Sequence, residues 1–278
     1  HPHLRLIQRL LHRPPRPLRR GHPRRPGQLH HPRVLRSGEL DPHLLRQRLG
    51  TVRLAAAPFG AGLGAALVGI YAAAQLLDPF APVMARAVLV AGMALHLAFW
   101  AVVIPVMRHR PGQGRVTPVW QLNFVGPIVA AQAAAGFGWT AFAQALWWPM
   151  AAMAAFVWIV SLRQLRAERV PAPLRPLLMI HVAPIAMLGT TAAAVGWPGV
   201  AQGFAVALVP ALALAALRVR WLTEAGFSAL WGAFTFPLAA SAGLWVAVSA
   251  DQPVWATPAR ALLILASLVI PPILFLVW

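Results

Sequence analysis

Long apolar runs dominate the chain from residue 51 onward. Eight runs of about 20 residues, the length that crosses the hydrocarbon core of a bilayer as an α-helix, lie at 54–77, 84–107, 117–138, 141–162, 174–195, 199–217, 227–249 and 257–278. Only a helix satisfies the backbone amides of such a run without water. The pattern predicts an all-α polytopic membrane protein with a transmembrane domain over residues 51–278.

The odd-numbered spans share a proline near their middle. Similar short contexts surround Pro127, Pro184 and Pro237, and a weaker copy surrounds Pro58. A proline inside a helix removes one hydrogen bond and kinks the helix. Because the turns after the odd-numbered spans are short, consecutive spans are expected to pair as hairpins. This predicts repeated helical hairpins around a central pore lined by kinked helices. The alternative is that these prolines have no special role, since proline is common in membrane helices.

The loops between the spans alternate in charge. The opposing side of the bilayer has only Arg86 and Arg260, beside Asp78 and Asp251. All other arginines after residue 50 fall on one side: Arg53, Arg108, Arg110, Arg115, Arg163, Arg166, Arg169, Arg175, Arg218 and Arg220. By the positive-inside rule, both termini are predicted to be cytoplasmic. We expect a multi-pass protein of the bacterial inner membrane.

Residues 1–50 differ from the rest of the chain. They hold half of the 24 basic residues, all of them arginine, together with many prolines and histidines. Such a segment cannot recover its conformational entropy by packing, so disorder is the expectation. Three interpretations remain open: a non-native reading frame, a basic tail attracted to anionic lipid, and a nucleic-acid-binding tail. The absence of interleaved aromatic residues argues against the last.

Composition excludes several classes of protein. The chain is 59% apolar and 11% charged, whereas a soluble domain carries about 25% charged residues. Cysteine is absent, which excludes disulfides, thiolate metal sites and cysteine nucleophiles. The spans hold no acidic residue away from their ends and no metal-ligand spacing of histidines. We therefore expect no enzymatic activity, no catalytic residue, no cofactor and no metal site, because such chemistry needs positioned acids, bases or metals.

Two histidines lie inside predicted spans. His96 stands at the centre of an even-numbered span, where an interhelical hydrogen bond is the first interpretation and a ligand role the second. His181 stands one turn before Pro184, where it either faces the passage or caps a carbonyl that the kink frees. Helix ends attract anions without any charged side chain. A passage without acids thus favours an anion or a neutral solute over a cation.

Three motifs occur in order along the odd-numbered spans. They are Thr117-Pro118 with 123–127, Leu174-Arg175-Pro176 with 180–184, and Phe227-Ser228 with 231–239. Their order, spacing and hairpin context resemble the tellurite-resistance/C4-dicarboxylate transporter family, which includes plant slow-type anion channels, malate permeases and sulfite exporters. The resemblance covers residues 51–278.

The resemblance implies ten helices, arranged as five hairpins around a pore, in a homotrimer. It implies a pore gate at Phe236, for which a buried aromatic at a helix interface is the alternative. It also places pore-lining or kink positions at Gly126, Pro127, His181, Pro184, Thr235 and Pro237. Two features depart from the family: Gly232 stands where a second tryptophan is common, and only eight of the ten spans are visible.

The function implied is a passive anion channel or transporter with a phenylalanine-gated pore. It would move small inorganic anions or organic acids, of the tellurite, sulfite, dicarboxylate, halide or nitrate class. The expected partners are small anions, the lipid bilayer and further copies of the chain, with no nucleic acid. The alternatives are a truncated or frame-shifted non-conducting fragment, a membrane interaction subunit, and a membrane enzyme acting on lipid or isoprenoid.

Overall fold

A computed structural model describes residues 62–109 and 116–277, which belong to one compact unit over Gln47–Trp278. In these residues helices are joined by turns, without a β-strand. Six helices are long and apolar enough to cross a membrane: Pro82–Arg108, Thr140–Ala167, Ala172–Ala194, Pro198–Leu217, Ala229–Ser249 and Pro253–Val277. The all-α class is confirmed for the described residues, and the six helices support a multi-pass membrane protein by their length and composition. The predictions for residues 1–50 and for Pro58 lie outside the described residues.

The two other predicted spans take different forms. Of the span 54–77, the structure describes a helix over Gly62–Leu77. The span 117–138 is divided into a π-helix, η1 (Gln121–Val125), and an α-helix, α4 (Pro127–Gly136), with Gly126 between them. A single uninterrupted helix is therefore not formed over 117–138.

Four helices are continuous α-helices despite their prolines. We call them the outer helices: α3 (Pro82–His109), α5 (Thr140–Ala167), α7 (Pro198–Leu217) and α10 (Ala256–Val277). Many of their large apolar side chains are exposed, among them Leu97, Phe156, Leu214 and Leu268. Exposed apolar surface of this extent marks a membrane-facing side. The short helices α8 (Val219–Leu222) and η4 (Pro253–Trp255) lie in the connections.

Three helices change their helix type part-way, and we call them the inner helices. They are η1–α4, η2 (Ala172–Val182) with α6 (Ala183–Ala194), and η3 (Ala229–Phe234) with α9 (Thr235–Ser249). The leading segment is a π-helix in the first and a 3₁₀-helix in the other two. Pro127, Pro184 and Pro237 fall in the first turn of α4, α6 and α9. Proline fits there because a first-turn amide needs no partner within its α-helix.

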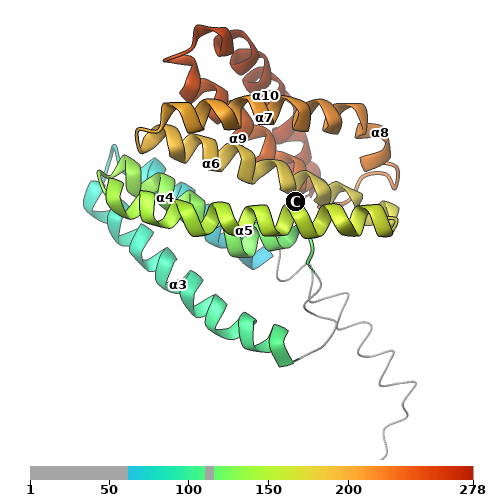
Figure 1. Ribbon diagram of the computed structural model, residues 1–278, viewed down its shortest axis with the longest axis horizontal. Coiled ribbons are helices and arrows are strands. Elements are labelled where there is room, and N and C mark those ends of the chain that lie inside the picture. The colour runs from blue at the N-terminus through green and yellow to red at the C-terminus, as the bar shows by residue number, and fades with distance from the viewer. Residues whose placement is uncertain (1–61, 110–115, 278) are drawn as a thin grey trace, which may run out of the picture. The chain divides into compact units, whose positions relative to one another are not determined.

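The inner helices form the core of the described region. Helix α6 contacts both α4 and α9, and α4, α6 and α9 pack against the following outer helices α5, α7 and α10 (Figure 1). Gly189 permits the close approach around α6, since a Cβ there would lie 2.8 Å from Leu244 of α9 and from Phe204 of α7. Small residues serve this purpose at helix contacts in membranes.

The turns at 138–139 and 196–197 are the same structure. Gly138 and Gly196 have φ values of +83° and +82°. In each turn, the amides of the glycine and of the tryptophan that follows it bond to carbonyls of the preceding helix. This is the Schellman arrangement, which requires the left-handed conformation that glycine adopts without a steric cost. Both turns fold an outer helix directly back onto an inner one.

Candidate functional site

A small cavity of about 20 Å³ lies where the inner helices change their helix type. Its wall comes from the Gly62–Leu77 helix, from η1 and α4, from η2 and α6, and from α9. Apart from Gln121, every lining side chain is apolar: Val68, Leu122, Val125, Ile128, Val129, Ile180, Ala183, Pro184, Met187 and Phe236, with Gly126. The space is sufficient for about one water molecule.

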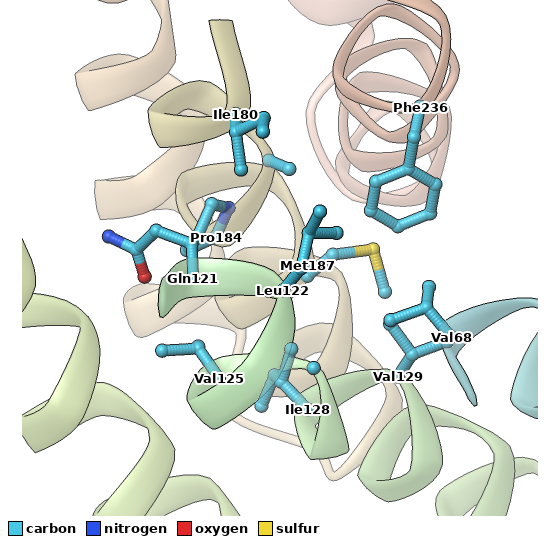
Figure 2. Close-up of a pocket in the computed structure, with 12 residues that line it drawn as sticks. Val68, Gln121, Leu122, Val125, Ile128, Val129, Ile180, Pro184, Met187 and Phe236 are labelled. Atoms are coloured by element: carbon cyan, nitrogen blue, oxygen red, sulfur yellow. The ribbon is translucent and has the colours of Figure 1, made fainter. Parts of the chain in front are cut away.

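Phe236 is the aromatic residue of this wall. It lies in the first turn of α9, and its ring points toward the space shared with Met187 and Val68 (Figure 2). The side chain is partly buried and packs against the core cluster around α4. It is thus an apolar side chain in the wall of the cavity, whose other lining residues come from three further segments.

Hydrogen bonds from α3 support the break between η1 and α4. The carbonyl of Asn123 has no α-helical donor, because its partner four residues later would be Pro127. Instead, Trp100 Nε1 donates to this carbonyl at 2.7 Å and His96 Nε2 lies 2.8 Å from it. Since a carbonyl only accepts, His96 carries its proton on Nε2, and Nδ1 accepts from the Tyr71 hydroxyl at 2.9 Å. The predicted interhelical hydrogen bond of His96 is confirmed.

An equivalent bond supports the break between η2 and α6. The carbonyl of His181 would find its 3₁₀ partner at Pro184, which has no N–H. Trp158 of α5 supplies the donor, with Nε1 3.0 Å from the carbonyl oxygen. Trp100 and Trp158 each lie 23 residues before the carbonyl that they bind. The Schellman glycines Gly138 and Gly196 are separated by the same interval as these two tryptophans.

Several polar side-chain atoms near the breaks are buried without a hydrogen-bond partner among the described residues. Both amide atoms of Gln121 and both ring nitrogens of His181 belong to this group. Gln121 is 3% exposed, and its amide points away from Phe236 (Figure 2). The carbonyl-capping role considered for His181 is performed by Trp158 instead. The imidazole is left with two unused polar atoms in an apolar surrounding, which is costly unless a polar group meets them.

The structure brings only some of the predicted site residues to the cavity. Phe236, Pro184 and Gly126 line it, whereas Pro127, Pro237, Thr235 and His181 are not in its wall. A Cβ on Gly126 would collide with the carbonyl oxygen of Leu122, so glycine is required at this break. Thr235 Oγ1 donates to the carbonyl of Gly232 at 2.7 Å within its own helix.

Sequence reasoning missed Gln121 and the two tryptophan donors. The signal available for the tryptophans was the repeated interval between each indole and the proline-bearing segment that follows it. The described residues also hold no group of three His, Cys, Asp or Glu side chains that could bind a metal ion. All four of their acidic residues lie in turns or loops between helices: Asp78, Glu168, Glu224 and Asp251.

The chain was compared with protein-family models and with curated proteins. No family model and no curated protein matches it.

Proposed function

We propose that this protein is a passive channel or transporter for small anions, with Phe236 as the gate of its pore. The observation that carries this proposal is the cavity at the three helix breaks, with Phe236 in its wall. The resemblance of residues 51–278 to the tellurite-resistance/C4-dicarboxylate transporter family supports it. This resemblance implies a gate at Phe236, which lines the cavity.

The electrostatics of the breaks support an anionic substrate. The first turns of α4, α6 and α9 all contribute residues to the cavity, and the N-terminal end of an α-helix carries partial positive charge. A helical segment that precedes the α-helix would normally offset this positive charge, because its last carbonyl oxygens carry partial negative charge. Here the carbonyls of Asn123 and His181 are bound by donors from the outer helices. These bonds reduce the negative potential of the two carbonyls at the breaks before α4 and α6, which favours an anion over a cation near them.

The third break supports Phe236 as the moving part. The breaks at α4 and α6 are each bound by an indole from an outer helix. At the break before α9, the side-chain hydrogen bond is local, from Thr235 Oγ1 to the carbonyl of Gly232. Among the described hydrogen bonds, the break before α9 therefore has no donor from an outer helix, so one restraint present at the other two breaks is missing there. A gate requires such freedom, because it must move away from the passage without disturbing the surrounding core.

The remaining parts of the proposal concern assembly and location. The hairpins act as repeats around the pore, in a homotrimer in the bacterial inner membrane with both termini cytoplasmic. The common interval between the two tryptophan donors and the two Schellman turns supports the repeat. The positions of the loop arginines support the orientation.

The proposal is tested by anion flux from proteoliposomes that hold the full chain. Chloride, nitrate and malate efflux are measured for the parent and for Phe236→Ala. Removing the phenyl ring clears the constriction, and a barrier lowered by about 1.4 kcal/mol or more gives at least about a tenfold higher flux. Phe142→Ala is the matched control, because Phe142 lies at the beginning of α5 and is 40% exposed.

Three outcomes have distinct meanings. A large increase for Phe236→Ala, with parental flux for Phe142→Ala, supports a gated pore. An unchanged flux in a folded Phe236→Ala protein overturns the gate. If neither protein conducts any of the three anions although both are folded and inserted, the channel proposal fails and a non-conducting interaction subunit becomes the better interpretation.

A further inference from the structure

A long apolar groove lies between α7 and α10, away from the cavity at the helix breaks. It has a volume of about 670 Å³. Its floor is buried and includes Met179, Phe234 and Trp245. Its rims are exposed and are lined on α7 by Val209, Ala213 and Ala216, and on α10 by Ala261 and Leu265. Both helices pack against α9, which leaves the groove open between them.

The dimensions of the groove match one leaflet of a bilayer. On the α7 side, its lining runs from Val209 of α7 to Val219 at the start of α8, ten residue steps that span up to about 15 Å at the rise of an α-helix. The hydrocarbon core of a bilayer is about 30 Å thick, so a single leaflet accounts for half of that. An acyl chain has the apolar surface and the length to fill such a groove.

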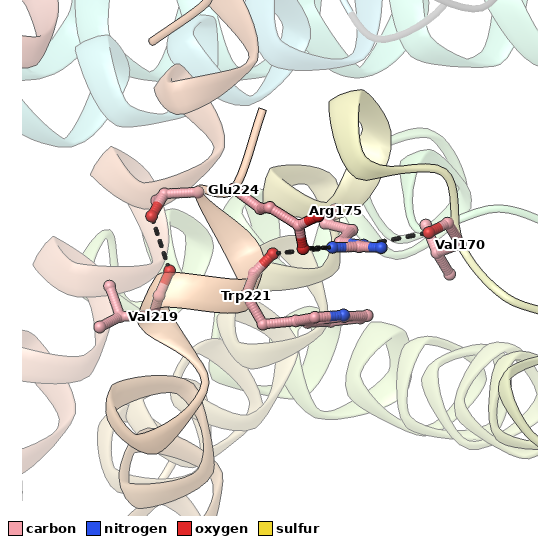
Figure 3. A network of polar contacts seen from close by, with 6 residues as sticks. Val170, Arg175, Val219, Trp221 and Glu224 are labelled. Atoms are coloured by element: carbon pink, nitrogen blue, oxygen red, sulfur yellow. Dashed lines mark hydrogen bonds and ion pairs between the residues drawn. The ribbon is translucent and has the colours of Figure 1, made fainter. Parts of the chain in front are cut away.

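Two arginines flank Val219, the groove residue at the start of α8. Val219 lines the groove, and Arg218 and Arg220 on either side of it are exposed. The nearby acid does not neutralise them, because Glu224 forms its ion pair with Arg175 (Figure 3). Arg175 is held in place by the carbonyls of Val170 and Trp221 and by the Trp221 ring, 4.5 Å from its guanidinium carbon. Within the described part of the chain, no ion pair involves Arg218 or Arg220.

We infer that this groove binds one acyl chain of an anionic phospholipid, whose phosphate is held by Arg218 and Arg220. The apolar lining of the groove matches an acyl chain, and the two arginines beside its end, which form no ion pair among the described residues, match an anionic headgroup. The arginine-bearing loops are those predicted to be cytoplasmic, so the lipid belongs to the inner leaflet, where anionic lipids attract basic residues. The inference is independent of the proposed anion path, since it requires only that the helices lie in a membrane with the arginine-bearing loops on the cytoplasmic side.

The test is a titration of the full chain in neutral detergent with palmitoyl-oleoyl phosphatidylglycerol and with the corresponding phosphatidylcholine, followed by native mass spectrometry. Phosphatidylglycerol is expected to bind more tightly. Arg218→Gln with Arg220→Gln should weaken phosphatidylglycerol about thirtyfold, since each basic residue contributes about a factor of five near anionic lipid. Arg163→Gln with Arg166→Gln is the charge-matched control, at exposed positions at the end of α5.

A second pair of variants tests the groove itself. Ala213→Phe fills the groove and should weaken both lipids, whereas Ala207→Phe on the same helix is exposed and outside the groove, and should leave binding unchanged. Equal loss in the two arginine pairs, or parental binding by a folded Ala213→Phe protein, overturns the proposal. It is also overturned if Ala213→Phe converts an oligomer into a monomer while lipid binding persists, because the groove would then be a contact between copies of the chain.

Discussion

Prolines occur in both the inner and the outer helices, but with opposite exposure. Pro127, Pro184 and Pro237 of the inner helices are buried, whereas the outer helices expose theirs, namely Pro105, Pro149, Pro210, Pro271 and Pro272. A helix bends away from its proline because the ring collides with the carbonyl four residues earlier. An exposed proline therefore places the convex side of an outer helix toward the membrane, which is the curvature of a helix that wraps a core.

The inner helices respond differently because their prolines face neighbouring helices. The chain before each proline becomes a π-helix or a 3₁₀-helix, and at the first two breaks a carbonyl left without its helical donor is bound from another helix. Trp100 and Trp158 of the outer helices supply those donors. The comparison teaches that proline alone does not break a membrane helix here. All three breaks lie at buried prolines, and two of them also receive a donor from another helix.

The largest effect is expected where the inner helices approach most closely. Gly189→Ala places a Cβ 2.8 Å from Leu244 and Phe204, and overpacking of this kind costs about 1–3 kcal/mol. On the outer helix α7, Gly203→Ala meets nothing within 4 Å and should stabilise the helix by up to about 1 kcal/mol, because alanine has the higher helix propensity. Unfolding of both variants in mixed detergent micelles measures the difference. Equal effects at the two positions would contradict the division into inner and outer helices.

An effect of comparable or smaller size is expected from the tryptophan donors. Trp158→Phe keeps a ring but removes the N–H, leaving the His181 carbonyl without this donor at a cost of about 1–3 kcal/mol. Trp100→Phe should cost less, because His96 still donates to the Asn123 carbonyl. Trp148→Phe, at an outer position 64% exposed, should change stability by less than about 0.5 kcal/mol.

Thermal unfolding in detergent, monitored by circular dichroism, ranks these three variants. The order expected for the loss of stability is Trp158→Phe first, Trp100→Phe second and Trp148→Phe last. If Trp148→Phe is as harmful as Trp158→Phe, the tryptophans act by ring packing, and hydrogen bonding is not what holds the breaks.

The helical class and the hairpin turns could be predicted from the sequence because both depend on local patterns. Apolar length identifies a span, and Gly138 and Gly196 mark turns that only a few residues define. Helix α5 nevertheless continues to Ala167, beyond the predicted end at 162. A helix keeps its internal hydrogen bonds outside the bilayer, whereas the apolar pattern marks only the part inside it.

The helix breaks could be predicted only in part. The prolines marked their positions, but the donors come from residues 23 positions earlier on another helix, which no local pattern identifies. The same holds for the candidate site. Phe236 was predicted and lies in the cavity wall. Gln121 lies there as well, but it belongs to a π-helix, whose register differs from that of the α-helix predicted over 117–138.

The smallest effect is expected in the connection between the inner helix segment η2 and α8. Glu224 is 59% exposed and its partner Arg175 only 14%, so Glu224→Gln should cost less than about 1 kcal/mol and lose most of that effect in high salt. Arg175→Lys should cost more, because lysine cannot reproduce both the planar stack on Trp221 and the bonds to two backbone carbonyls. Unfolding at low and high salt separates the two contributions. If Glu224→Gln lowers stability more than Arg175→Lys does, and the loss persists at high salt, the ion pair rather than the stack on Trp221 holds this connection. A contact in a loop would then contribute as much to stability as a contact between inner helices.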